Sequence, residues 1–386
     1  HRVSSLHNLK KKTNLKRQKK TKKTKTKQKQ KIYKFFYLKD IYVFFLSAMK
    51  IIQDTKLDFS DVLIQPQNTS LKSRSDVTLE REFKFPNTDQ IWKGVPLIAS
   101  NMDTVGTVEM YHSLKKHNML TCFHKFINDY PENDRNKYIV SIGIRDIDFD
   151  KLENLYKLSP EKCNLVCVDV ANGYMDSLIQ FCLRVRELIP QCILIAGNVV
   201  TGERTKELIV KGKVDIVKVG IGNGSVCTTR LQTGVGMPQL SAILECGEAA
   251  HSVSGHIICD GGITCPGDAA KAFGAGSDFV MMGSMLAGHE ESGGDLIKEN
   301  EKLYKIFYGM SSKEAMDKHY GGVNNYRSSE GKCVKIEYKG QVINTINNLL
   351  GGLRSTCTYV DAKNIEDLEK NIIFYRVNNI VNKIYG

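Results

Sequence analysis

The stretch Leu165-Val166-Cys167-Val168-Asp169-Val170 is a continuous apolar run that is interrupted only by one carboxylate near its end. A short run without polar alternation is typical of a parallel strand that is buried on both faces. Similar runs recur through the chain, separated by segments with helical periodicity. We therefore expect strands at 95–100, 119–123, 138–142, 165–170, 193–196, 216–219, 256–259 and 279–282.

Eight such strand–helix units over about 250 residues indicate an α/β fold of the closed (β/α)8 TIM-barrel type. An open doubly wound sheet is the alternative architecture. In a barrel, the loops that follow the carboxyl ends of the strands form the active face. The residues directly after each run are therefore the first candidates for a functional site.

The basic residues of this chain are concentrated at one end. The 386 residues carry a net charge of +13, but residues 1–48 hold 16 Lys or Arg and a single acid, whereas the remainder holds 39 basic and 41 acidic residues. We expect 1–48 to be a disordered extension, with Met49 as a credible true start, and 49–386 to be a single barrel domain. The charge of that domain gives no reason to expect binding to nucleic acid.

Membrane insertion is not expected either, because the apolar stretch 35–49 is short for a span and contains Lys39 and Asp40. A targeting segment is the alternative interpretation of this stretch. The eleven cysteines are odd in number and lack the paired spacing of metal ligands. This pattern suits a reducing compartment, and we expect a cytoplasmic protein.

The most informative candidate for chemistry is Cys227, in the segment Gly220-Ile221-Gly222-Asn223-Gly224-Ser225-Val226-Cys227-Thr228-Thr229-Arg230. Glycine at every second position allows positive φ angles and leaves backbone groups free to face a ligand or an ion. A cysteine in such a turn, directly after a strand, is a candidate nucleophile whose thiol must be deprotonated for attack. A core cysteine in a tight turn is the alternative.

Polar and glycine residues also follow the other strands. Asp260-Gly261-Gly262 comes after the seventh strand and Gly283-Ser284 after the eighth. In a barrel these are the usual positions for a phosphate, held by loop amides and a helix N-terminus. We therefore expect a phosphorylated substrate, although either glycine pair alone is also compatible with a plain tight turn.

From about Lys56 to Asn379 the chain resembles the family of GMP reductase and inosine monophosphate dehydrogenase. The Cys227 segment is one carrier of the resemblance, and Asn223 departs from it where the family often has proline. The other carriers are 57–63, 101–105, Asp169-Val170-Ala171-Asn172-Gly173, 260–262, 273–276, 308–312, 326–331 and 351–358.

Two short connections favour the reductase branch of this family. The dehydrogenases commonly insert a regulatory domain after the second strand, but only 14 residues separate Phe123 from Tyr138. They also carry a long flap that activates water, but only 18 residues separate Ser311 from Glu330. The resemblance then implies reduction of GMP by NADPH to IMP and ammonia, as part of purine nucleotide interconversion.

The resemblance also implies roles for individual residues. Cys227 would attack carbon 2 of the purine and form a thioimidate, while Thr229 and Glu330 would pass protons to the departing amine. Nucleotide contacts are implied for Asp260, Gly261, Gly262, Gly283, Ser284, Gly309, Met310, Ser311, Arg327, Ser328, Ser329, Glu330 and Gly331. Since a carboxylate is poorly suited to a phosphate, Asp260 is the candidate for the ribose hydroxyls.

Cofactor contacts are implied for Lys125, Asp169, Val170, Ala171, Ile221, Gly222, Met310, Tyr326 and Arg327. A neighbouring subunit of a homotetramer is expected to add Ser73, Arg74, Ser355, Thr356, Cys357 and Thr358. Arg74 and Lys125 are candidates for the extra phosphate of NADPH, with ordinary solvated charges as the alternative. A potassium-like cation is expected at Gly222, Gly224, Cys227, Thr229 and Arg230.

Three interpretations of the function remain open from the sequence. The first is the reductase just described. The second is an oxidoreductase of the dehydrogenase type, which differs in its pair of substrates. The third is a catalytically silent protein that binds purine nucleotides. An assay of turnover with each pair separates them.

Overall fold

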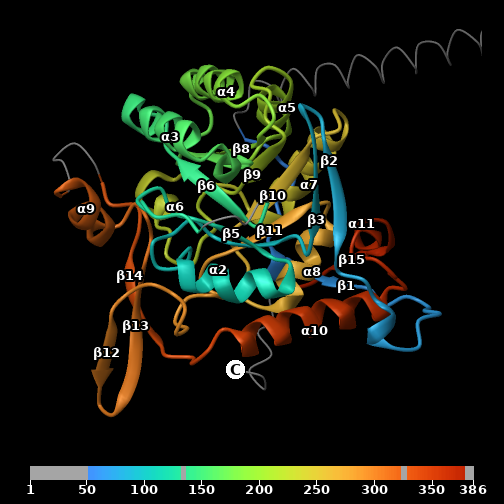
Figure 1. Ribbon diagram of the computed structural model, residues 1–386. Coiled ribbons are helices and arrows are strands. Elements are labelled where there is room, and N and C mark those ends of the chain that lie inside the picture. Colours follow the sequence, from blue (N-terminus) through green and yellow to red (C-terminus); the bar gives the residue numbers. More distant parts are fainter. Residues whose placement is uncertain (1–50, 132–135, 323–327, 379–386) are drawn as a thin grey trace, which may run out of the picture. The chain divides into compact units, whose positions relative to one another are not determined.

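The eight expected strands are all present, all parallel, and closed into one barrel in the computed structural model (Figure 1). Closure is direct, because the last strand pairs with the first through Val280 and Leu97. The TIM-barrel prediction is therefore confirmed, and the open-sheet alternative is wrong. The barrel strands are β4 (Leu97–Ala99), β5 (Leu120–Cys122), β6 (Tyr138–Ile142), β7 (Leu165–Asp169), β8 (Ile193–Val199), β9 (Ile216–Val219), β10 (His256–Asp260) and β11 (Phe279–Met282).

The structure describes residues 51–131, 136–322 and 328–378. Within this part, the chain from Lys56 onward forms one compact unit. The expected basic extension 1–48, including most of the apolar stretch 35–49, lies outside the described residues. None of the helices in the described ranges is both long enough and apolar enough to cross a bilayer.

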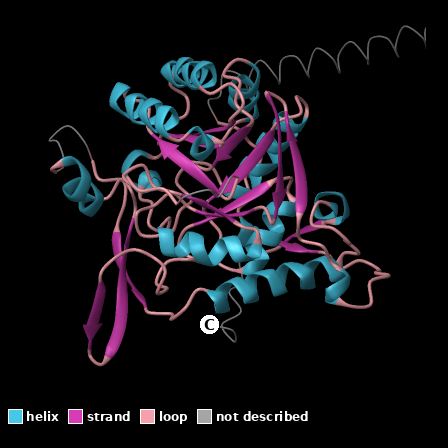
Figure 2. Ribbon diagram, viewed as in Figure 1, coloured by secondary structure: helices cyan, strands magenta, loops and turns pink. Residues whose placement is uncertain are grey.

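Helices surround the strands of the barrel (Figure 2). They alternate with the strands along the chain, as the helical periodicity between the apolar runs predicts. The helices are α2 (Val108–Leu114), α3 (Asp146–Leu158), α4 (Asp176–Leu188), α5 (Gly202–Val210), α6 (Thr229–Thr233), α7 (Gln239–His251), α8 (Pro266–Gly274), α9 (Lys313–Tyr320), α10 (Ile343–Tyr359) and α11 (Asp367–Asn371).

Strand alternation sorts the apolar residues into two cores. Leu165 and Cys167 of β7 belong to a cluster made only of strand and hairpin residues, which fills the barrel. Val166 and Val168 belong to a larger cluster shared with the surrounding helices. Because side chains alternate between the two faces of a strand, Asp169 continues the inward-facing series. The same rule directs the ends of the other strands.

The amino end of the barrel is plugged by an antiparallel hairpin, β2 (Arg81–Phe85) and β3 (Thr88–Gly94). Phe83 and Trp92 of the hairpin pack on Phe279, the first residue of β11, with ring centroids 4.3 and 5.4 Å apart. Aromatic burial of this kind closes that end of the barrel. The carboxyl end is left for the functional site.

Two smaller sheets complete the fold. One pairs β1 (Val62–Ile64) with β15 (Phe374–Arg376). The other is an antiparallel sheet of β12 (Leu296–Glu299), β13 (Lys302–Tyr308) and β14 (Cys333–Glu337), seen at the lower left of Figure 1. Since β13 and β14 flank the segment 309–332, this sheet delivers both ends of that segment to the site.

Candidate active site

Cys227 lies in a glycine-rich loop that follows β9. Gly222 has φ +80°, a conformation that residues with a β-carbon rarely adopt, and a β-carbon there would lie 2.6 Å from Cγ of Arg230. The backbone N–H of Cys227 donates to the carbonyl of Gly224 at 3.0 Å. The glycines therefore let the loop fold tightly around the side chain of Arg230, with the Cys227 thiol half-buried.

The accessibility of Cys227 distinguishes it from most other thiols of the chain. All eleven cysteines are free, and eight of them are buried. Burial raises the pKa of Cys182 and that of Cys192 to about 12, which keeps both thiols protonated and unreactive. Cys227 instead combines partial exposure with polar neighbours, as a nucleophile requires.

A backbone contact brings a segment 100 residues away to this loop. Gly331 forms an antiparallel bridge with Cys227, and the N–H of Thr228 donates to the carbonyl of Glu330 at 2.8 Å. Gly331 also bridges to Ser312, whose backbone nitrogen would lie 2.8 Å from a β-carbon at Gly331. Only glycine fits between these two segments. The bridge places the side chain of Glu330 beside the loop.

The side chains of the three candidate catalytic residues form a chain of hydrogen bonds. The thiol of Cys227 donates to Oγ1 of Thr229 at 3.2 Å, and the Thr229 hydroxyl donates to Oε2 of Glu330 at 2.8 Å. A hydroxyl can accept one proton while it donates another. The arrangement can therefore move a proton between the sulfur and the carboxylate.

Arg230, which follows this triad in the sequence, is directed elsewhere. Its Nη2 donates to the carbonyl of Met237 at 2.7 Å, and its Nη1 lies 3.8 Å from Oδ2 of Asp58. None of the described hydrogen bonds or ion pairs joins the guanidinium to Cys227. Arg230 therefore braces the loop through the Met237 carbonyl.

The candidate substrate residues at the end of β10 lie against the same loop. Gly261 and Gly262 have φ of +87° and +80°. The amide of Asn223 donates to the carbonyl of Asp260 at 2.9 Å and lies 3.3 Å from where a β-carbon of Gly261 would be. Asn223, which departs from the family pattern, thus fastens the Cys227 loop to the neighbouring strand end.

Gly283 and Ser284 follow β11, next to the end of β4. A β-carbon at Gly283 would lie 3.2 Å from Sδ of Met102 and 3.4 Å from Oγ of Ser100. The expected helix N-terminus is absent here, because 284–288 form turns in which the N–H groups of Leu286 and Ala287 bond to the carbonyl of Gly283. The amides of Gly283 and Ser284 remain the available anion donors of this loop.

The segment 309–311 contacts both Glu330, beside the Cys227 loop, and Asp103, which follows β4. The carbonyl of Ser311 accepts from the N–H of Glu330 at 3.1 Å, and Sδ of Met310 accepts from the N–H of Asp103 at 3.4 Å. Ser328 and Ser329 continue this side, with the Ser329 hydroxyl bonded to the Gly331 carbonyl at 3.0 Å. Two predicted contacts, Tyr326 and Arg327, lie outside the described residues.

Asp103 joins α9 to the barrel. Its buried carboxylate accepts from the hydroxyl of Tyr308 at 2.7 Å, Nε2 of His319 at 2.7 Å and Nζ of Lys318 at 3.1 Å. Burial alone raises the pKa of Asp103, but these three donors together hold it below its usual value. This cluster could not be predicted from the sequence, because Asp103 lies more than 200 residues before its three partners.

Lys125, a predicted cofactor residue, lies close to Tyr320 of α9. Its Nζ is 5.5 Å from the ring centre of Phe126 and 5.6 Å from that of Tyr320. The neighbouring His124 is largely buried, which lowers its pKa to about 4, so it is neutral near pH 7. Arg145 also lies over the Tyr320 ring, 5.7 Å from its centre, so Lys125 is one of two cations beside this ring.

Asp169 ends β7, and its carboxylate meets the buried Lys218 of β9. Nζ of Lys218 lies 2.5 Å from Oδ1 of Asp169. Burial raises the pKa of Asp169, but the Lys218 ammonium lowers it by more, so the pKa lies below its usual value. Burial lowers the pKa of Lys218, but the carboxylates of Asp169 and Asp260 together hold it well above its usual value. Lys218 could not be recognised from the sequence, because a lysine within an apolar run does not reveal its partner.

The remaining candidate cofactor residues form a separate surface. The short helix η2 (Arg74–Asp76), which Ser73 caps, packs against α10, the helix that contains 355–358. Cys357 is wholly buried, while its neighbours Thr356 and Thr358 are partly exposed. None of the described hydrogen bonds links this surface to Lys125 or Asp169.

Several polar atoms at the carboxyl end of the barrel have no partner among the described residues. They are Oγ of Ser100, Oδ1 of Asn198 and Oγ1 of Thr228, all buried. Buried polar atoms are rarely left without a hydrogen bond. Their position around the Cys227 loop fits the binding of a polar ligand there.

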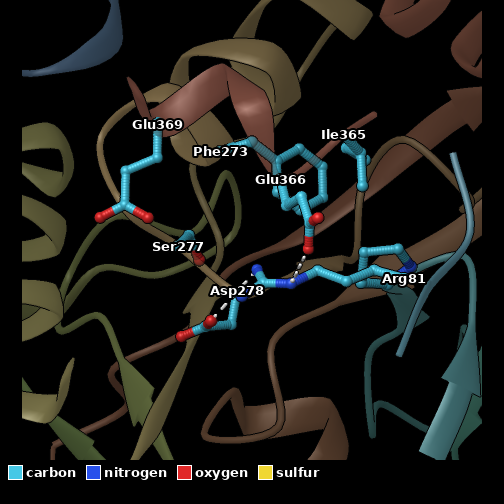
Figure 3. A pocket seen from close by; sticks show the side chains of 8 residues that line it. Arg81, Phe273, Ser277, Asp278, Ile365, Glu366 and Glu369 are labelled. Carbon is cyan, nitrogen blue, oxygen red and sulfur yellow. Dashed lines mark ion pairs between the residues drawn. The ribbon is translucent and has the colours of Figure 1, made fainter. Parts of the chain in front are cut away.

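The small cavity in Figure 3 lies at the opposite end of the barrel. Arg81 spans it, with Nη1 3.3 Å from Oδ1 of Asp278 and Nε 3.5 Å from Oε2 of Glu366. Asp278 directly precedes β11, and none of the candidate site residues lines this cavity. Its ion pairs hold the hairpin against the barrel and take no part in the site.

The sequence of this chain matches one family of known proteins. The model of the IMP dehydrogenase / GMP reductase domain matches residues 128–383. A GMP reductase of Shewanella halifaxensis is 52% identical over 347 residues, which is 88% of this chain and 99% of its own length. GMP reductases of Shigella flexneri and Salmonella typhi are each 53% identical over the same shares. The chain therefore belongs to the IMP dehydrogenase / GMP reductase family.

Proposed function

We propose that this protein is a GMP reductase, which converts GMP and NADPH to IMP, ammonia and NADP. The observation that carries the proposal is the hydrogen-bonded chain from Cys227 through Thr229 to Glu330 at the carboxyl end of the barrel. The relatives that are 52–53% identical over nearly their whole length are named GMP reductases. The name and the geometry point to the same reaction.

Cys227 is the proposed nucleophile. Its sulfur bonds to carbon 2 of the guanine ring while the thiol proton passes through Thr229 toward Glu330. The bond from carbon 2 to the amino nitrogen then breaks, and the nitrogen leaves as ammonia after taking up protons from the Glu330 side. The product of this half-reaction is a thioimidate between Cys227 and the purine.

When bound, the nicotinamide cofactor supplies a hydride to carbon 2. Once carbon 2 carries this hydrogen, the sulfur of Cys227 would leave it as a thiolate, which restores the nucleophile. Thr229 and Glu330 have no amine to protonate in this half-reaction. The overall proton balance is one proton taken up for each ammonia released.

The nucleotide would be held at both its ribose and its phosphate. The carboxylate of Asp260 suits the ribose hydroxyls, since an ionised carboxylate only accepts hydrogen bonds. The backbone amides of 261–262 and 283–284 suit the phosphate. Met310 and Ser311, with 328–331, would cover the base from the other side, and the unpartnered Oγ of Ser100 lies in the same region.

The residues present fit a nicotinamide dinucleotide phosphate. Lys125 offers a cation beside aromatic rings, and Asp169 offers a carboxylate that is 35% exposed. Arg74, on the surface shared by η2 and α10, would meet the cofactor of a neighbouring subunit in the homotetramer that we propose. In this arrangement the second group of cofactor residues acts across a subunit boundary.

The Cys227 loop also fits a potassium-sized cation. The carbonyls of Gly222, Gly224 and Cys227 are the proposed ligands, together with Thr229 and Arg230 nearby. A hard monovalent cation prefers such backbone oxygens. The buried, unpartnered hydroxyl of Thr228 adds an oxygen to this loop. The cation would stiffen the loop that carries the nucleophile.

We place the protein in the cytoplasm and propose no partner among nucleic acids or membranes. The eleven free cysteines are consistent with a reducing compartment. The barrel domain carries 39 basic and 41 acidic residues, so its charge does not favour a polyanion.

A turnover assay tests the function. The purified protein is supplied with GMP and NADPH, or with IMP and NAD, and the nicotinamide absorbance is followed. Loss of NADPH that depends on GMP, with release of ammonia, supports the reductase. Formation of NADH from IMP would identify a dehydrogenase instead, and binding of GMP without turnover would identify a silent nucleotide-binding protein.

A further inference from the structure

Lys218 is buried in the bore of the barrel. It follows Ile216, which belongs to the cluster that fills the barrel, by two residues, so its side chain has the same inward direction. Only 2% of that side chain is exposed. A lysine is almost never buried to this extent without charged partners.

The ammonium of Lys218 has three acceptors from three other strand ends. Its Nζ lies 2.5 Å from Oδ1 of Asp169, 3.2 Å from Oδ1 of Asn101 and 3.3 Å from Oδ2 of Asp260. An ammonium carries three protons, so each can be directed at one of these oxygens. The ends of β4, β7 and β10 are thereby tied to β9 at one point.

These contacts use only one oxygen of Asp260. Its Oδ2 is next to Lys218 and accepts from Nδ2 of Asn198 at 2.7 Å. Its Oδ1 accepts no hydrogen bond from any described residue, and the side chain is 22% exposed. The carboxylate is therefore fixed at one oxygen and open at the other.

The two carboxylates on Lys218 belong to the two proposed ligands. Asp260 is the candidate for the ribose of the nucleotide, and Asp169 is a candidate for the cofactor. Two carboxylates this close together repel each other, and the ammonium of Lys218 offsets that repulsion by attracting both. The orientation of each carboxylate therefore depends on Lys218.

We propose that Lys218 is a positioning residue that presents Oδ1 of Asp260 to the ribose diol and so sets the selectivity of the site for ribonucleotides over 2′-deoxyribonucleotides. This inference rests on the proposed function, because it concerns the same nucleotide site. It extends that function by assigning the selectivity to a residue that does not touch the nucleotide. Through Asp169, the same lysine also supports cofactor binding.

Equilibrium binding of GMP and of 2′-deoxy-GMP, measured by calorimetry without cofactor, tests the proposal. The intact protein is expected to bind GMP about 10- to 100-fold more tightly, the range for hydrogen bonds to a charged group. In Lys218→Met most of this preference is expected to disappear. Combining Lys218→Met with Asp260→Asn should reduce the preference no further, since both changes remove the same interaction.

Lys305 provides a matched control. It is also a buried lysine, but among the described residues its Nζ bonds only to the backbone carbonyls of Glu290 and Ser292. Lys305→Met removes a buried cation without touching Asp260. The preference for GMP over 2′-deoxy-GMP is therefore expected to be unchanged in this variant, even if its stability falls.

Lys218→Met leaves two carboxylates without their cation, which threatens folding. The double variant Lys218→Met/Asp169→Asn removes one charge of each sign and serves if the single variant does not fold. An unchanged preference for GMP in either variant would overturn the inference, as would an intact protein that binds both nucleotides equally. Failure of the proposed function is seen separately, as an intact protein that binds GMP but does not reduce it.

Discussion

Oγ1 of Thr229 lies 2.8 Å from Oε2 of Glu330, although their positions in the sequence differ by 101. The contact depends on the backbone bridge between Cys227 and Gly331, which aligns the two segments. Since Thr229 also accepts from the Cys227 thiol, it stands between the nucleophile and the carboxylate. The Thr229 hydroxyl thus joins the sulfur to the carboxylate in one hydrogen-bonded path along which a proton can move.

Removal of the nucleophile separates chemistry from binding. In Cys227→Ser we expect GMP reduction to be abolished, because a serine hydroxyl at this position is a much weaker nucleophile than a thiolate. Nucleotide affinity should change little, since the ribose and phosphate contacts do not involve sulfur. Turnover is followed by nicotinamide absorbance and binding by calorimetry. Substantial GMP reduction by the serine variant would refute the covalent mechanism.

The relay from Thr229 to Glu330 predicts a split between the two half-reactions. Thr229→Ala or Glu330→Gln should slow GMP reduction by roughly 100-fold or more, because the departing amine then lacks its proton donor. Hydride transfer needs no such proton, so both variants should still produce a rapid burst of NADPH when mixed with IMP and NADP. Stopped-flow absorbance measures the burst.

Thr233→Ala is the matched control for this relay. Thr233 lies in the same short helix, and its hydroxyl bonds to the backbone carbonyl of Thr229 at 2.8 Å. Its removal should leave both half-reactions close to normal. If the burst in Thr229→Ala slows as much as the overall reaction, the two residues shape the whole site and the relay assignment fails.

The cofactor assignment predicts a selective change in KM. Arg74→Ala and Lys125→Ala should each raise KM for NADPH much more than KM for GMP, because each removes a cation proposed to bind the extra phosphate. Lys115→Ala is the control for Lys125: Nζ of Lys115 also lies over an aromatic ring, 4.8 Å from the centre of Tyr111, but before β5 and not after it. Normal NADPH saturation in both variants would mean that the charges are merely solvated.

The barrel was predictable from the sequence because each strand is a continuous apolar run, a pattern that depends only on neighbouring residues. The loop of Cys227 was predictable for the same reason, since its glycines are local. The contact of Thr229 with Glu330 was expected only through the family resemblance. The pairing of Lys218 with Asp169 and Asp260 was not foreseen, because it depends on the register of three strands.

At the amino end of the barrel, His251 makes the stability of the fold depend on pH. His251 lies 2.9 Å from Oδ2 of Asp278 and 3.4 Å from Oε1 of Glu369. Its hydrogen bonds to Asp278, and then to Glu369, raise the pKa of His251 from 6.5 to about 10. Because the pKa of His251 is higher in the folded protein than in the unfolded chain, its protonated form stabilises the fold. This stabilisation is complete below about pH 6.5, the pKa of the unfolded chain, and is lost between about pH 6.5 and pH 10.

His251→Gln should therefore lower Tm clearly at pH 6.5 and only slightly at pH 9.5. The informative quantity is the difference in Tm between the variant and the parent at each pH, because the contributions of groups remote from His251 cancel in it. Differential scanning calorimetry at both values provides it. A difference that is the same at pH 6.5 and pH 9.5 would show that the histidine contributes by packing alone and not by its charge beside Asp278.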